Sequence, residues 1–271
     1  MHQSSPVVNK PSADPKVLLR EGAASLNVPL EQEQTDLLLD LARRILEKSR
    51  VINLTGARDL ATLVMDHILD SLALIPLIHE RAAPGSRRTA GHTRRTAGRP
   101  LLVDVGSGGG FPSLPLAIAL GRFDVLCIES VGKKARILEE ICTASALAHV
   151  TIVNDRAERV GHDPQWRERA DWATARGVGC LATASELTLP FLRPGGVFLA
   201  QKGASPRAEL DVARPAIAQL GGQPGSIVRV GSAPVRRRRT VVIIEKIAHT
   251  PERFPRRPGL PAKRPIGGGK P

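Results

Sequence analysis

The sequence predicts an α/β protein of three layers, in which helices cover both faces of a mostly parallel sheet. The first observation is that short apolar runs alternate with segments of helical spacing from residue 101 onward, and such alternation gives parallel strands with right-handed crossovers. The second is that the last two apolar runs, 226–231 and 240–247, have no helix between them. They predict an antiparallel hairpin at the end of the sheet.

The part of the chain before the sheet is predicted to be a polar, disordered terminus (1–14) followed by a helical subdomain (15–80). Within this subdomain, 30–48 and 60–78 carry apolar residues at helical spacing. Residues 81–99 then form a basic loop of low complexity, in which the sequence RRTAG occurs twice.

The sheet domain is predicted over 100–248. Its strands, in order, are 101–105, 123–130, 150–154, 171–175, the VFLAQK run after a Pro-Gly-Gly turn at 194–196, 226–231 and 240–247. Its first helix follows the glycine-rich loop and ends near 120, and three further helices span 132–147, 181–192 and 206–219. Residues 249–271 are predicted to be a basic, Pro-rich tail.

The composition fits one or two domains with an aliphatic core. The chain has 271 residues, of which 42% are hydrophobic but only 3% aromatic, so it is not wholly disordered. Cys127, Cys142 and Cys180 lack the spacing of a disulfide pair or a metal site, so we expect reduced thiols, no bound metal and a cytoplasmic protein. No apolar leader is visible, and Pro, Gly or charge interrupts every apolar run before ~18 residues, so no membrane span is expected.

The positive charge is concentrated in three stretches. Lys and Arg number 39 against 26 Asp and Glu, a net charge of +13. The loop 81–99, the run Arg236–Arg239 and residues 250–271 hold this excess, and the rest of the chain is close to neutral. Such stretches attract polyanions in a salt-dependent way. An Arg-rich bias of composition explains the charge alone equally well.

A glycine-rich loop directly follows the first strand of the sheet. It reads Asp104-Val-Gly106-Ser-Gly108-Gly-Gly-Phe111 and lies where folds of this class bind ligands. Glycine lets the backbone approach a ligand closely. A dinucleotide fingerprint needs a third glycine at position 111, so Phe111 argues against a nicotinamide cofactor.

Glu129 ends the second strand, 23 residues after the first glycine. A carboxylate near this spacing accepts hydrogen bonds from both ribose hydroxyls of an adenosine-bearing cofactor. The alternative is an exposed acid at a strand end, and the glycine loop favours ribose binding.

Several further motifs occur in a fixed order. They are INLTG (52–56), HILDSLAL (67–74), DVGSGGGFPSLPLAIA (104–119), ESVGKKARIL (129–138), DRAE (155–158), TAR (174–176) and QKG (201–203). Together they resemble the ribosomal RNA small subunit methyltransferase G family, over roughly residues 30–247. This resemblance implies a Rossmann-like class I methyltransferase sheet, with an antiparallel terminal strand, that binds S-adenosyl-L-methionine.

The resemblance also implies the reaction and the partners. The expected reaction is methylation of N7 of a guanine, guanine 527 in the family, in 16S ribosomal RNA. The expected partner is this RNA or the small ribosomal subunit, and the expected state is a monomer. Because N7 already carries an exposed lone pair, the resemblance implies alignment of the reactants and no catalytic acid or base.

The family's cofactor contacts map onto a small set of positions. The predicted cofactor-binding residues are Asp104, Gly106, Gly108, Phe111, Glu129, Ala157, Glu158 and Arg176. Phe111 either packs against the cofactor or caps the core. Glu158 either reaches the adenine or is a solvated acid. Arg176 holds the methionine carboxylate or an RNA phosphate, or else is a plain surface arginine.

The predicted RNA contacts are Lys133, Lys134, Lys202, Arg237 and Arg238. Lys133 and Lys134 begin a helix, where positive charges are unfavourable because they oppose the helix dipole. Binding of an RNA phosphate would explain why two lysines stand there. His67 is interpreted as a core histidine, with a catalytic histidine as the alternative, and Asp70 and Ser71 as residues that fix the helical subdomain to the sheet.

Three other hypotheses stay open on the sequence. The same cofactor domain serves methyltransferases of small molecules or proteins. An NAD-dependent oxidoreductase is disfavoured by Phe111. A catalytically idle RNA-binding protein would use the basic stretches without transferring a methyl group.

Overall fold

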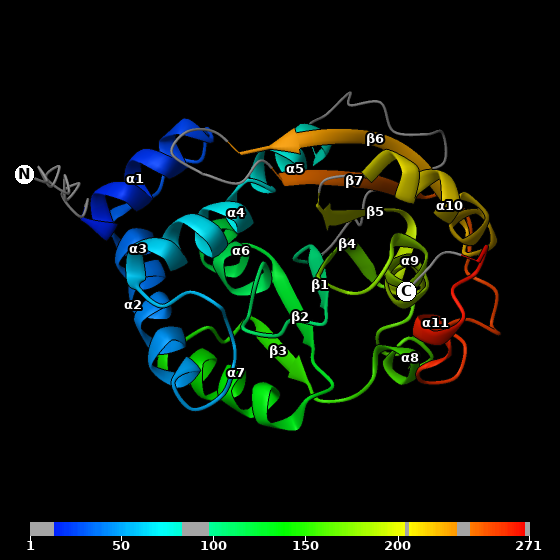
Figure 1. The fold of residues 1–271 in the computed structure, drawn as a ribbon, viewed down its shortest axis with the longest axis horizontal. Helices are drawn as coiled ribbons and strands as arrows, with labels where there is room; N and C mark the ends of the chain where they lie inside the picture. The colour runs from blue at the N-terminus through cyan, green and yellow to red at the C-terminus, as the bar shows by residue number, and fades with distance from the viewer. Residues whose placement is uncertain (1–13, 83–97, 204–205, 232–238, 269–271) are drawn as a thin grey trace, which may run out of the picture.

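The computed structural model describes residues 14–82, 98–203, 206–231 and 239–268 and contains one mixed sheet. Seven strands lie in the order β3-β2-β1-β4-β5-β7-β6 (Figure 1). The strands are β1 (Leu101–Val105), β2 (Asp124–Ile128), β3 (Val150–Val153), β4 (Ala170–Arg176), β5 (Leu192–Lys202), β6 (Gly222–Val230) and β7 (Arg239–Lys246). Strands β1 to β5 are parallel to one another, and β7 is antiparallel to both β5 and β6. The predicted mostly parallel sheet and terminal hairpin are confirmed.

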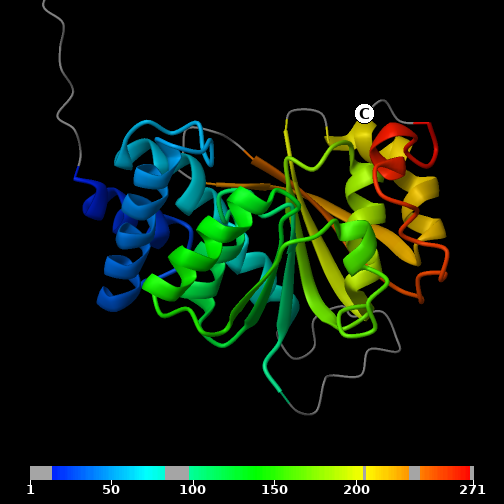
Figure 2. The ribbon, with the colours of Figure 1, turned by 90° about the horizontal axis from the view of Figure 1, so that it is seen from below.

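Helices cover both faces of this sheet (Figure 2). They are α6 (Ser113–Leu120) and α7 (Gly132–Ala144) on one face and, on the other, α8 (Ala157–Val160), α9 (Leu181–Thr188), the 3₁₀ turn η2 (Leu189–Phe191) and α10 (Pro206–Gln219). Successive strand residues point to opposite faces. Leu102 therefore belongs to the hydrophobic core on the α6 side and Val103 to the core on the α9 side. The predicted three layers are confirmed.

The N-terminal helices extend the layer that contains α6 (Figure 1). They are α1 (Pro15–Ser25), α2 (Gln32–Ser49), α3 (Leu60–Leu63), the π-helical turn η1 (Val64–Ile68), α4 (Leu69–Leu72) and α5 (Ile75–Ala82). Among the described residues, Leu60–Ala82 is long and apolar enough to cross a membrane, but 67% of its most apolar stretch is buried in the protein. Such burial is the pattern of a core helix.

The single helix predicted over 60–78 is divided in the structure. A π-helical turn at Val64–Ile68 widens it, and the helix stops after Leu72. Pro76 at the start of α5 has no N–H to continue the earlier helix, whereas it fits the first turn of a new one. Because of the break, α5 takes a new direction.

The Pro-Gly-Gly turn predicted at 194–196 lies inside β5. This strand already pairs with β4 at Leu192, and the pairing shifts register before Val197. Gly195 has a φ of +89°, and a Cβ on Gly196 would lie 3.0 Å from the Ala170 carbonyl oxygen. The sequence therefore encodes a bulge within a longer strand, and the preceding helix ends at Thr188, not at 192.

The predicted tail folds back on the sheet domain over its described part. We call residues 249–268 the strap; it includes α11 (Leu260–Lys263) and buries Phe254 and Pro261. The prediction of a basic, Pro-rich tail did not include this packing; two buried apolar side chains among Pro and Arg fix the path of the strap. The predictions for 1–13, 83–97, Arg237 and Arg238 lie outside the described residues.

Candidate cofactor and substrate cleft

The glycine loop lies at the carboxyl edge of the sheet, immediately after β1. Gly106, Gly108 and Gly110 have φ values of +73°, +57° and +85°, a region that side chains disfavour. The Gly106 amide donates to the Ile128 carbonyl oxygen at 2.9 Å, which ties the loop to the end of β2. A Cβ on Gly108 would meet only the Gly106 carbonyl oxygen, at 3.8 Å. At Gly108 the loop thus presents backbone without a side chain to open space.

Glu129 joins this loop to the second strand. Its Oε2 accepts the Gly108 N–H at 2.8 Å, and its Oε1 accepts the Val131 N–H at 2.7 Å. The side chain is buried, and the Asn154 amide at the end of β3 donates to the Glu129 carbonyl oxygen at 2.8 Å. The alternative of an exposed acid at a strand end is therefore wrong. Glu129 and Gly108 therefore lie side by side at the carboxyl edge and can contact the same ligand.

Asp104 lies beneath the loop. Its Oδ1 accepts the Thr174 hydroxyl at 3.0 Å from the neighbouring strand β4. Burial raises the pKa of the Asp104 carboxyl, although the hydrogen bond from Thr174 opposes the shift. The Ser107 hydroxyl also donates to the Asp104 carbonyl oxygen. These contacts let Asp104 support the loop from below, and its contact with a cofactor stays a prediction.

Arg176, at the end of β4, is held by the helical subdomain. Its Nη1 lies 2.9 Å from Asp70 Oδ2, and its Nη2 lies 3.0 Å from His67 Nδ1. Arginine only donates, so His67 Nδ1 must accept, and Nε2 carries the proton of a neutral ring. This assignment lets Nε2 donate to Thr55 Oγ1 at 2.8 Å. His67 thus orients Arg176. It is half-buried, so it lies at the edge of the core and not within it.

Phe111 lies under the same pair. Its ring centroid is 4.8 Å from that of His67 and 5.4 Å from Arg176 Cζ, and the ring is 4% exposed. Of the two predicted roles for Phe111, the structure shows that it packs in the core, and a contact with the cofactor stays a prediction. The Arg176 side chain keeps 18% of its surface exposed, so it stays partly accessible to a ligand.

Asp70 connects the helical subdomain to several strands. It is 2% exposed and forms a second ion pair with Arg239 Nε at 3.2 Å, at the start of β7. The Gln201 amide in β5 donates to the Asp70 carbonyl oxygen at 3.1 Å. The predicted packing role of Asp70 is confirmed. Sequence reasoning missed Gln201, Arg239 and the bond from Thr55, although Thr55 and Gln201 lie in quoted motifs and Arg239 ends the tetra-Arg run.

Ala157 and Glu158 open α8 after the third strand, and both are buried. Glu158 Oε1 accepts the N–H of Gly259 in the strap at 2.8 Å. A solvated loop acid is therefore excluded. The adenine contact predicted for these two residues stays a prediction, and any such contact by the Glu158 side chain shares the carboxylate with the strap.

The predicted RNA contacts differ in their surroundings. Lys133 is exposed and Lys134 half-buried at the start of α7, next to the cleft. Lys202 is engaged: its Nζ lies 2.7 Å from Glu209 Oε1 and 2.9 Å from the Gly179 carbonyl oxygen, and its side chain is 11% exposed. A phosphate would have to compete with this ion pair between β5 and α10.

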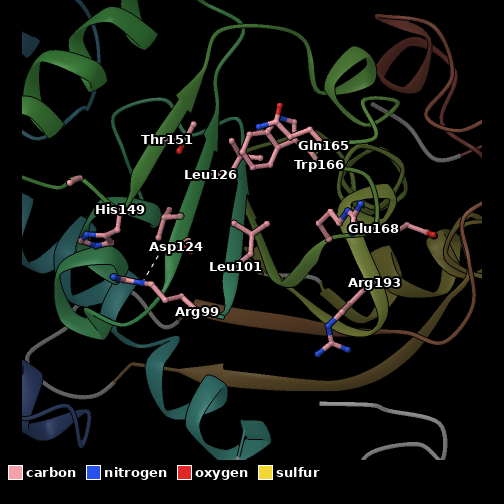
Figure 3. Close-up of a pocket in the computed structure, with 13 residues that line it drawn as sticks. Arg99, Leu101, Asp124, Leu126, His149, Thr151, Gln165, Trp166, Glu168 and Arg193 are labelled. Carbon is pink, nitrogen blue, oxygen red and sulfur yellow. Dashed lines mark ion pairs between the residues drawn. The ribbon is translucent and has the colours of Figure 1, made fainter. Parts of the chain in front are cut away.

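A cavity of about 550 Å³ lies at the opposite, amino ends of the strands (Figure 3). Leu101 and Asp124, the first residues of β1 and β2, line it together with Trp166. Arg99 Nε pairs with Asp124 Oδ1 at 3.0 Å across its mouth. None of the described residues predicted to bind the cofactor lines this cavity, so it is not the candidate site.

Comparison with known proteins places this site in a family. The family model described as rRNA small subunit methyltransferase G matches residues 34–241. Three similar curated proteins are named ribosomal RNA small subunit methyltransferase G. That of Roseiflexus castenholzii is 42% identical over 90% of this chain and 97% of its own length. That of Rubrobacter xylanophilus is 39% identical over 89% and 87%, and that of Alkaliphilus oremlandii is 33% identical over 93% and 98%.

Proposed function

Because this chain belongs to the rRNA small subunit methyltransferase G family, we propose that its carboxyl-edge cleft methylates N7 of a guanine in 16S ribosomal RNA. Membership of this family shows that the protein is an S-adenosylmethionine-dependent methyltransferase. The guanine, the small ribosomal subunit as partner, a monomeric state and a cytoplasmic location are parts of this proposal.

The hydrogen bond between Glu129 and the Gly108 amide is the observation that supports the cofactor assignment most directly. It places the Glu129 carboxylate, which can accept hydrogen bonds from a ribose, 2.8 Å from the backbone amide of Gly108, which has no side chain. A side chain at Gly108 would project into otherwise open space, as expected where a ligand approaches backbone. The residues therefore fit S-adenosylmethionine, which supplies a methyl group on a cationic sulfur. Glu129 would accept its ribose hydroxyls, and the loop would flank its methionine portion.

The remaining requirement is alignment, because guanine N7 needs no deprotonation. Orientation of two reactants can lower a barrier by ~7–11 kcal/mol. Arg176 is suited to this role, since Asp70, His67 and Phe111 hold its guanidinium from three sides. Its exposed side would hold the methionine carboxylate or a phosphate of the RNA. Lys133 and Lys134 would contact RNA phosphates beside it.

The test uses purified protein, methyl-labelled S-adenosylmethionine and small-subunit RNA that lacks the modification, free and assembled into subunits. We expect label at N7 of a single guanine. Label on a metabolite or a protein in place of RNA would support the other methyltransferase hypotheses. RNA binding without any label would indicate an idle RNA-binding protein. Either outcome contradicts the proposal.

A further inference from the structure

We propose that the strap, together with the exposed Arg156 before α8, is a docking platform for the RNA backbone near the carboxyl edge of the sheet. This proposal rests on the proposed function, since it assumes that the substrate is an RNA. It differs from a flexible basic tail, because the platform is folded and its cations have fixed positions.

The strap is anchored through donors that lie beneath it. Arg167 Nη1 and Nη2 donate to the carbonyl oxygens of Phe254 and Thr250, each at 2.8 Å. Arg256 pairs with Glu186 of α9, whose carboxylate is fully buried, at 2.6 Å. These contacts fix the backbone of the strap at several points along its length.

The end of the strap returns to the carboxyl edge, where the cofactor loop lies. The Thr183 hydroxyl, in the first turn of α9, donates to the Pro261 carbonyl oxygen at 2.9 Å. Gly259 N–H binds Glu158 at the start of α8. Since α8 follows β3 and α9 follows β4, these contacts hold α11 on the outer side of α8 and α9, on the side of the carboxyl edge (Figure 2). A nucleic acid seated on α11 would therefore extend towards the carboxyl edge of the sheet.

Acids and cations are separated on this platform. Glu158 and Glu186 are buried and each accepts hydrogen bonds from the strap. Their charges are therefore turned inward. The exposed side carries a set of cations for which the described part of the chain provides no ion-pair partner: Arg156, Arg257, Lys263 and Arg264.

This arrangement favours a polyphosphate over an apolar or mixed partner. Glu252 is the exposed acid of the strap, and the strap's Phe254 is buried. Arg and Lys contacts to phosphates release counterions, and each contact adds about −0.7 to −0.9 to the slope of log affinity against log salt concentration. An acidic protein is the competing partner, and the experiment below separates the two.

The experiment compares a platform variant with a matched control. The platform variant carries Arg257→Gln, Lys263→Gln and Arg264→Gln; the Arg264 carbonyl oxygen, which accepts from the anchoring Arg256 at 2.8 Å, belongs to the backbone and is kept. The control carries Arg20→Gln, Arg43→Gln and Arg229→Gln, exposed cations on α1, α2 and β6. Both remove the same charge. Deletion of the strap is unsuitable, because it would expose Glu186 and the core beneath Phe254.

Binding of a small-subunit RNA fragment is measured from 50 to 300 mM salt, and binding of S-adenosylmethionine by calorimetry. We expect the platform variant to bind RNA more weakly, with a log–log salt slope shallower by ~2, and to bind S-adenosylmethionine as the wild type does. The control should keep the wild-type slope. Equal slopes for both variants would overturn the proposal, as would loss of binding to an acidic protein with unchanged RNA binding. Failure of the proposed function is a separate result, namely wild-type protein that binds RNA but transfers no methyl group.

Discussion

Replacing Asp70 by Asn tests whether the helical subdomain positions the cleft. Asp70 is 2% exposed and pairs with Arg176 and Arg239, whose side chains keep 18% and 26% of their surface exposed. Breaking a fully buried ion pair costs ~3–5 kcal/mol. Because water reaches both arginines here, we expect a loss of ~2–3 kcal/mol in the free energy of unfolding. For a chain of this size that loss lowers Tm by ~4–12 °C.

The assay combines denaturant unfolding with methyl transfer at a temperature where the variant is folded. We expect transfer to fall as well, because Arg176 loses the partner that fixes its guanidinium. Asp211→Asn is the matched control, since its pair with Arg214 is more than half exposed on both sides and such pairs contribute ~0–1 kcal/mol. An Asp70→Asn variant with the stability and the activity of the control would refute the positioning role of Asp70.

Three other predictions follow from individual sites. Burial lowers the pKa of the Lys246 ammonium from 10.5 to about 8, so between these pH values the unfolded chain binds more protons and the free energy of unfolding rises with pH, by as much as ~3 kcal/mol. The variant Lys246→Met should flatten this rise in unfolding measurements from pH 7.5 to 10, and an unchanged profile would contradict the assignment. Gly106→Ala should cost ~1–2 kcal/mol of stability and weaken cofactor binding, because φ is +73° and the new Cβ would lie 2.9 Å from Val178. In the control Gly56→Ala the new Cβ has no atom within 4 Å, so this variant should bind the cofactor normally. Burial raises the pKa of the Cys127 and Cys142 thiols, that of Cys142 to about 12, so iodoacetamide at pH 8 should label only Cys180 in the folded protein and all of the cysteines after unfolding. Labelling of Cys127 in the folded protein, detected by mass spectrometry, would contradict its burial.

The sheet and the glycine loop were predictable because their signals are local. Strand and helix periods, the glycines from 106 to 110 and the acid at Glu129 each lie within a short window of sequence. The direct bond between Glu129 and Gly108 then follows from the topology, since β1 and β2 are parallel neighbours and their carboxyl ends meet at one edge.

The network around Asp70 was predictable only in part. Asp70 and Arg239 are far apart in the sequence, and pairing depends on β7 lying beside β5, an order that no local pattern encodes. Lys202 illustrates the same limit: its place at the strand end was predicted, but its partner Glu209 comes from the next helix. The tail itself was predicted, but its packing was not, because its anchors, Arg167 and Glu186, lie in other elements.

The central claim, that the glycine loop and Glu129 together bind the adenosine of S-adenosylmethionine, is tested most directly by calorimetry on Glu129→Gln. The variant loses charge-assisted hydrogen bonds worth ~1.5–3 kcal/mol, so its affinity should be ~10- to 100-fold lower than that of the wild type. The control Glu140→Gln, whose partner Lys48 is exposed on another surface, should bind like the wild type. Wild-type affinity in a folded Glu129→Gln protein would contradict the account.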